Sequence, residues 1–177
     1  MRFRYLLFVL VLVLPLISCG DSSETIPAPP VDLLTAIDKE NITIVKQHID
    51  AGTNINDYPI PEGLPFEGAQ PIHLAVLKDN AEIMKMLLEN GAQIDLKAKD
   101  ENEATPLHWA AFFAMKDMVS LLIDSGAPIN ALDANGATPL DSCLLSWVIS
   151  EDDEGKERLG EIIDILRGNG GLNGSDL

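Results

Sequence analysis

The stretch that decides the fold spans residues 104–130 and reads ATPLHWAAFFAMKDMVSLLIDSGAPIN. It begins with a turn signal, Thr105-Pro106-Leu107-His108, and continues as two short apolar segments of helical spacing that end at Gly126. Proline suits the first position of a helix, and glycine suits the position just after its end. The stretch therefore predicts a pair of short helices.

The same pattern recurs on both sides of this stretch. Pro71 lies 20 residues before Gly91, which is also the spacing of proline and glycine in the first stretch, and Thr138 follows Thr105 by 33 residues. A fixed period of this length indicates a repeat protein, in which each helix pair buries its apolar face against its neighbours.

These residues resemble the ankyrin repeat. Its Thr-Pro-Leu-His-x-Ala-Ala motif is matched at 105–111, and its paired leucines before a Gly-Ala stop are matched at 87–92 and 121–127. The resemblance implies an all-α fold, an α-solenoid of about four stacked helix pairs with hairpin fingers. It also implies a structural part for the repeated motif residues, which are Pro71, His73, Gly91, Thr105, Pro106, Leu107, His108, Gly126, Thr138, Pro139 and Leu140.

Four units are expected within residues 31–171. They are an N-terminal cap, two regular repeats and a divergent C-terminal cap, at 31–56, 70–95, 105–130 and 138–171. In the last unit Asp141 replaces the histidine, and an acidic insert over 151–155 is expected to be a solvated loop. A disordered tail is expected over 172–177, because glycine-rich sequence does not sustain a helix.

The N-terminus carries a different signal. Arg2 and Arg4 precede an apolar run at 6–17, whose core is shorter than the roughly 20 residues of a membrane-spanning helix. The run ends at Leu-Ile-Ser-Cys19-Gly, which resembles the end of a bacterial lipoprotein signal peptide. That resemblance implies a signal peptide over 1–18 and acyl chains on the thiol and amine of Cys19. Ordinary secretion with an incidental Cys19, or an uncleaved anchor, are the alternatives.

Residues 19–30 are expected to form a tether, because their small polar residues and prolines cannot bury enough surface to fold. The lipoprotein resemblance implies a bacterial cell-envelope protein, lipid-anchored on the periplasmic side, with inner and outer membrane left open. The second cysteine, Cys143, lies in an apolar helical run and is expected to be a buried thiol.

Charge and composition narrow the classes of function. The 177 residues carry a formal net charge of −16, which repels a phosphate backbone and argues against nucleic-acid binding. The three histidines and two cysteines do not have the spacing of a zinc site, and no phosphate loop or nucleophile elbow is found. The sequence therefore predicts a protein that is not an enzyme, without catalytic residue, metal or cofactor.

The predicted function is non-enzymatic protein binding by a membrane-tethered monomer. The connection at 57–69 is six residues longer than the shortest connection and holds apolar residues among prolines. It either packs on its own repeat or contacts a partner. Trp109 is either a stacking aromatic or a groove contact. The candidate partner contacts are Tyr58, Ile60, Leu64, Phe66, Lys97, Lys99 and Trp109.

The acidic composition favours a partner protein with a basic surface, because complementary charge speeds encounter. A narrower hypothesis is an immunity or inhibitor protein that neutralises a toxic enzyme at the envelope. The hypotheses from other classes are an unrecognised envelope hydrolase that uses acidic residues, and a purely structural envelope component.

Overall fold

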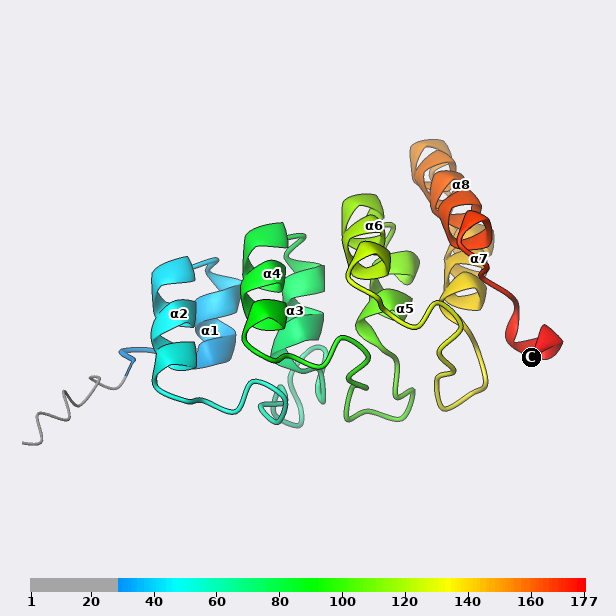
Figure 1. Ribbon diagram of the computed structural model, residues 1–177. Helices are drawn as coiled ribbons and strands as arrows, with labels where there is room; N and C mark the ends of the chain where they lie inside the picture. Colours follow the sequence, from blue (N-terminus) through cyan, green and yellow to red (C-terminus); the bar gives the residue numbers. More distant parts are fainter. Residues whose placement is uncertain (1–28) are drawn as a thin grey trace, which may run out of the picture.

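The structure, a computed structural model, describes residues 29–177. The expected signal peptide, Cys19 and most of the tether lie outside the described residues. Eight α-helices and no strand occur between residues 29 and 177, and the helices form four pairs stacked in a row (Figure 1). The expected all-α solenoid is confirmed. The helices are α1 (Leu33–Asp38), α2 (Ile42–Asp50), α3 (Pro71–Leu77), α4 (Ala81–Glu89), α5 (Pro106–Phe112), α6 (Lys116–Asp124), α7 (Pro139–Ile149) and α8 (Asp153–Gly168).

Local sequence explains where most of these helices begin. Helices α3, α5 and α7 start at a proline, and the preceding Thr138 of α7 accepts the N–H of Asp141 on its side chain. Asn41 and Asn80 cap α2 and α4 by accepting a backbone N–H three residues further on, at 3.2 and 3.0 Å. Each cap satisfies a helix N–H that has no partner within the helix.

Stacking of the pairs buries one continuous core. The first helices of the pairs (α1, α3, α5 and α7) contact one another along the row, and each second helix packs against the first helix of its own pair (Figure 1). Among the helices between residues 29 and 177, none is both long and apolar enough to cross a membrane. The largest fully buried side chains are Leu33, Ile37, Ile72, Ile83, Met84, Leu87, Leu107, Met118, Leu122, Leu140, Ile162 and Leu166.

Two buried histidines join successive repeats. Nδ1 of His73 accepts the N–H of Gln70 at 3.3 Å, and its Nε2 donates to the carbonyl of Ala104 at 3.0 Å. His108 repeats the second contact with the carbonyl of Ala137, also at 3.0 Å. Burial lowers the pKa of His73 to about 4 and lowers the pKa of His108 as well. Both rings are therefore neutral at neutral pH.

The C-terminal residues 172–177, expected to be disordered, are instead folded against the last repeats. The N–H of Gly174 donates to Oδ2 of Asp141 at 2.7 Å, and the N–H of Leu172 donates to Oδ1 of Asn130 at 2.8 Å. A short 3-10 turn follows. Asp141 occupies the position of His73 and His108 in the preceding repeats, and its carboxylate accepts an N–H from the following segment where those histidines donate to a carbonyl.

The acidic stretch 151–155 also differs from the expected solvated loop, because most of it begins α8. Asp152 caps this helix by accepting the N–H of Gly155 at 2.8 Å. Asp153 and Glu154 occupy the first turn, where the helix dipole stabilises negative charge. The stretch is thus a helix start.

Candidate functional site

The face formed by the first helices and the connecting fingers carries two adjoining cavities. We call the connections at 57–69, 96–104 and 131–137 the first, second and third fingers. The first cavity, of about 1090 Å³, is lined by α1, α3 and the first finger. The second, of about 650 Å³, is lined by α5, α7 and the other two fingers. Phe66 and Phe113 line both cavities, so together the cavities form one groove that these two rings divide.

The first finger is fixed to the elements on either side of it. The N–H of Lys99, on the second finger, donates to the carbonyl of Gly68 at 2.8 Å. Gly68 has a φ of 77°, and a Cβ at this position would collide with the backbone of Lys99. At the other end, the N–H of Tyr58 donates to Oε1 of the buried Gln70 at 2.9 Å. Gln70 replaces the threonine of the later repeats, and its longer side chain reaches this N–H.

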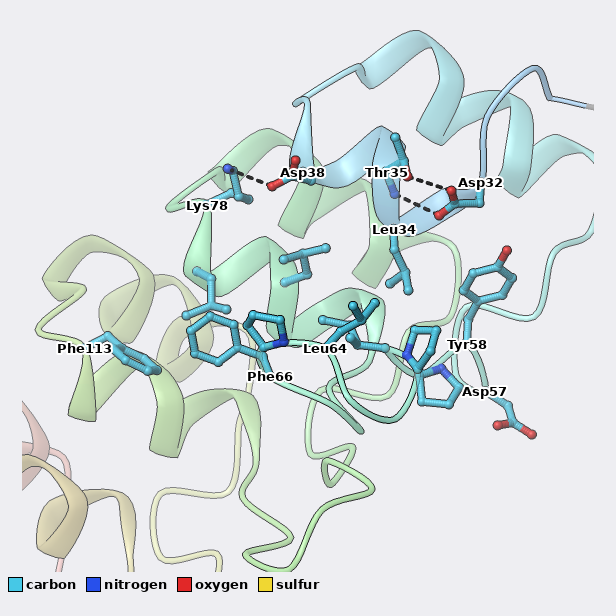
Figure 2. Close-up of a pocket in the computed structure, with 16 residues that line it drawn as sticks. Asp32, Leu34, Thr35, Asp38, Asp57, Tyr58, Leu64, Phe66, Lys78 and Phe113 are labelled. Carbon is cyan, nitrogen blue, oxygen red and sulfur yellow. Dashed lines mark hydrogen bonds and ion pairs between the residues drawn. The ribbon is translucent and has the colours of Figure 1, made fainter.

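Phe66 lies near the C-terminal end of this finger in an unusual backbone conformation. Its φ of 61° is left-handed, which costs about 1–2 kcal/mol for a residue with a side chain. The ring lies 5.7 Å from the ring of Trp109 and 6.1 Å from that of Phe113, yet 48% of the residue stays exposed. Figure 2 shows Phe66 between Leu64 and Phe113 along the first cavity.

Trp109 is a stacking aromatic that also lines the groove. Only 8% of the residue is exposed, and its ring contacts those of His73 at 5.1 Å and Phe113 at 5.9 Å, as a stacking aromatic should. The same residue lines the second cavity. Trp109 is therefore part of the buried aromatic cluster and of the groove surface.

The other apolar candidates of the first finger all line the first cavity. Tyr58 and Ile60 are half-buried and pack against the core, whereas Leu64 is 54% exposed. In Figure 2, Leu34 of α1 points toward the side of the cavity on which Tyr58 and Leu64 lie. The finger therefore packs on its own repeat and presents apolar surface to the groove at the same time.

The two lysine candidates lie outside the linings of both cavities. Lys97 is exposed and pairs with Glu103 of its own finger at 3.3 Å. Lys99 is exposed and pairs with Asp57 of the first finger at 2.6 Å. Their ammonium groups thus link finger residues to one another.

Several groove residues were not among the candidates from the sequence, although they lie at a fixed spacing from the proline of each repeat. The residues three and six positions after the proline of each repeat line the groove. They are Leu74 and Leu77 in α3, Trp109 and Phe112 in α5, and Ser142 and Leu145 in α7. Aligning the repeats on their prolines would therefore have identified the whole row, of which only Trp109 was named.

Six aspartates line the groove, and Lys78 is the one lysine or arginine in the linings of the two cavities described between residues 29 and 177. Lys78 pairs with Asp38 at 3.3 Å, and the hydrogen bonds of Asp38 with Lys39 and Lys78 lower the pKa of its carboxyl group. The groove is therefore apolar in its floor and acidic at its rim. The aspartates are Asp32, Asp38 and Asp57 in the first cavity and Asp100, Asp133 and Asp141 in the second.

The described region holds neither a group of metal-ligating side chains nor a reactive thiol. Between residues 29 and 177, no three His, Cys, Asp or Glu side chains are grouped so as to hold a metal ion. Cys143 is buried, its Sγ lies 3.5 Å from the carbonyl of Leu159, and burial raises the pKa of the thiol to about 12. Such a thiol packs as a small apolar side chain.

Comparison with known families and proteins is consistent with this architecture. Residues 33–133 match the family model described as ankyrin repeats (3 copies). A BTB/POZ domain and ankyrin repeat-containing protein of Oryza sativa subsp. japonica, NH5.2, is 35% identical over 106 residues, which are 60% of this chain and 19% of the relative. Regulatory protein NPR5 of Arabidopsis thaliana is 34% identical over 107 residues, 60% of this chain and 20% of the relative.

A third relative is the transient receptor potential cation channel subfamily A member 1 of Drosophila melanogaster, 30% identical over 128 residues. That match covers 71% of this chain and 10% of the relative. The chain thus spans a fifth or less of the length of these three relatives.

Proposed function

This chain belongs to the ankyrin-repeat family, and we propose that it is a non-enzymatic module that binds a partner protein in its groove. The observation that carries this proposal is Phe66. A half-exposed aromatic ring is held in a strained backbone conformation where the two cavities meet. Strain of this kind persists where the surrounding structure enforces it, and it is concentrated at binding sites.

The groove has the composition of an interface centre. Its floor holds aromatic and branched apolar side chains, with Phe66, Trp109 and Phe113 in mutual contact. Aromatic residues at the centre of an interface supply most of its binding energy, while charged residues around them set specificity and speed of encounter. The acidic rim therefore fits a partner with a basic surface.

The second part of the proposal concerns location. Cys19 becomes the lipidated N-terminus of the mature protein and holds the repeats at the periplasmic face of a bacterial membrane. The basic start, the short apolar run and the Leu-Ile-Ser-Cys sequence support this, and the proline-containing stretch to residue 30 provides a spacer. A Cys19→Ser protein is expected to leave the membrane fraction, and its retention there after signal cleavage would contradict the anchor.

The binding proposal is tested by affinity capture from the cell envelope with the full chain. Phe66→Ala should reduce recovery of a stoichiometric partner by about tenfold, because truncation of an interface aromatic commonly costs this much. Val148→Ala is the matched control, since Val148 is 68% exposed and lies outside both cavities. A partner lost with Val148→Ala but kept with Phe66→Ala would bind the end of α7 and overturn the groove proposal.

A further inference from the structure

The second cavity carries negative charge that no basic side chain balances. Asp100, Asp133 and Asp141 line it, and its lining includes no lysine or arginine. None of these three carboxylates belongs to an ion pair formed between residues 29 and 177. His108, which also lines the cavity, is neutral near pH 7 because burial lowers its pKa.

The first cavity differs in this respect. Its Asp38 pairs with Lys78 at 3.3 Å, and its Asp57 pairs with Lys99 at 2.6 Å. The protein therefore pairs two of the three aspartates of the first cavity with lysines, whereas Asp32 accepts hydrogen bonds from Thr35, and it pairs none of the three aspartates of the second cavity. The unpaired carboxylates of the second cavity are therefore the ones that a basic group of a partner could neutralise.

Two of the carboxylates are held in position by their own fingers. Oδ1 of Asp100 accepts the backbone N–H groups two and three residues further on, at 3.0 and 2.9 Å. Oδ1 of Asp133 accepts those two and four residues further on, at 2.8 and 2.9 Å. Within residues 29–177, Oδ2 of each takes part in no hydrogen bond. Each carboxylate is thus fixed through one oxygen and has the other available for a ligand.

The apolar wall of the same cavity selects the kind of cation. Trp109, Phe112 and Phe113 line it beside Leu145. A planar guanidinium stacks on aromatic rings and donates to carboxylates in pairs, whereas a hydrated ammonium does neither as well. A single metal ion does not fit, because within residues 29–177 the carboxylates are not grouped as metal ligands.

We propose that the second cavity is a subsite for one arginine side chain of the partner protein. The guanidinium faces the carboxylates of Asp100 and Asp133, and the aliphatic stem lies against Trp109 and Phe112. This assignment rests on the proposed function and specifies the partner further. The partner's binding segment presents an arginine next to the apolar residue that occupies the first cavity.

The test uses the full chain with Trp147→Phe, which leaves Trp109 as the only tryptophan and hence as a fluorescence reporter inside the cavity. The probes are the capped peptide Ala-Ala-Arg-Ala-Ala and the same peptide with citrulline, a neutral isostere of arginine. The arginine peptide should give a saturable change with a Kd of about 1 mM or lower, and citrulline should weaken it by about tenfold.

A pair of charge-matched variants localises the effect. Asp100→Asn with Asp133→Asn keeps the Oδ1 acceptors and should weaken the arginine peptide by about tenfold. Asp38→Asn with Asp57→Asn removes the same charge from the first cavity and should leave the Kd within about twofold. Equal loss in both double variants, equal binding of citrulline, or no saturable change up to about 10 mM peptide would each overturn the arginine subsite.

Binding of the captured partner to these variants tests the arginine subsite separately from the proposed function on which it rests. If Phe66→Ala weakens that partner and the Asp100/Asp133 double variant does not, the groove binds but the arginine subsite is wrong. If neither change weakens it, the groove proposal itself fails.

Discussion

The ring of Phe66 lies 5.7 Å from the ring of Trp109, although the two residues belong to different repeats. Phe66 is on the finger that precedes the second repeat, and Trp109 is on α5 of the third. The contact therefore spans the second repeat and fixes the finger across the groove. Since Trp109 also meets the ring of His73 at 5.1 Å, the groove floor is continuous with the contacts that stack the repeats.

The attachment of the first finger is tested at Gly68. Gly68→Ala forces a Cβ into the backbone of Lys99 at a φ of 77°. We expect it to cost about 3 kcal/mol of the free energy of unfolding, through backbone strain and the loss of the bond between the fingers. Gly63 is the matched control, because its φ is 81° but a Cβ there meets nothing within 4 Å. Gly63→Ala should cost only about 1 kcal/mol in urea denaturation, and equal costs would contradict the finger contact.

A substitution in the turn between α3 and α4 should stabilise the protein. Asp79 has a φ of 48° and is exposed, but partial desolvation of its carboxyl group, together with the charge of Asp117, raises the pKa of that group. Asp79→Gly should raise the free energy of unfolding by about 1 kcal/mol, because glycine adopts this conformation without strain. Asp79→Asn removes only the charge and should gain less. A lower midpoint of denaturation for Asp79→Gly would be inconsistent with strain at this turn.

His73 should make stability fall at acidic pH. Its pKa is about 4 in the folded chain against an ordinary 6.5, so the unfolded chain binds the proton first as the pH falls. Stability is therefore fully retained above pH 6.5 and is lost progressively between 6.5 and 4, by up to about 3 kcal/mol. Urea denaturation across this range should show a shallower loss for His73→Gln than for the native chain. Parallel pH profiles would show that His73 titrates normally.

Asp141 should hold the C-terminal residues in place. Asp141→Ala removes the acceptor of the Gly174 and Thr138 N–H groups, so we expect a loss of about 1–3 kcal/mol. Amide exchange at Gly174 should accelerate while that of α3 stays unchanged. Asp141→Asn keeps an acceptor oxygen and should be milder, whereas unchanged exchange in Asp141→Ala would mean that other contacts hold the tail.

The helix pairs could be predicted because their signals are local. Proline at Pro106 and glycine at Gly126 mark the limits of one pair in the sequence itself, and the structure has helices between them. The second cavity could not be predicted in this way. Its Asp100 and Asp133 lie on different fingers. The relative position of these fingers depends on hydrogen bonds between them, such as that from the N–H of Ala134 to the carbonyl of Asn102, at 2.8 Å.

The position of the Phe66 ring could not be predicted from the sequence either. An aromatic residue in a long, proline-containing finger is a reasonable contact candidate, but its direction depends on a left-handed φ at that residue and on the anchoring of Gly68 to Lys99. The ordered tail has a similar origin. Its glycines suggested disorder, yet acceptors on Asn130 and Asp141, more than 30 residues earlier, satisfy its N–H groups.

The central claim is that a partner protein lies in the groove, and hydrogen–deuterium exchange of the full chain with and without the captured partner tests it most directly. Binding should slow exchange in the first finger and in α5, which carry Phe66 and Trp109, and should leave the second helices α2, α4 and α6 unchanged. Protection confined to those second helices, with the first finger exchanging as in the free chain, would contradict the account.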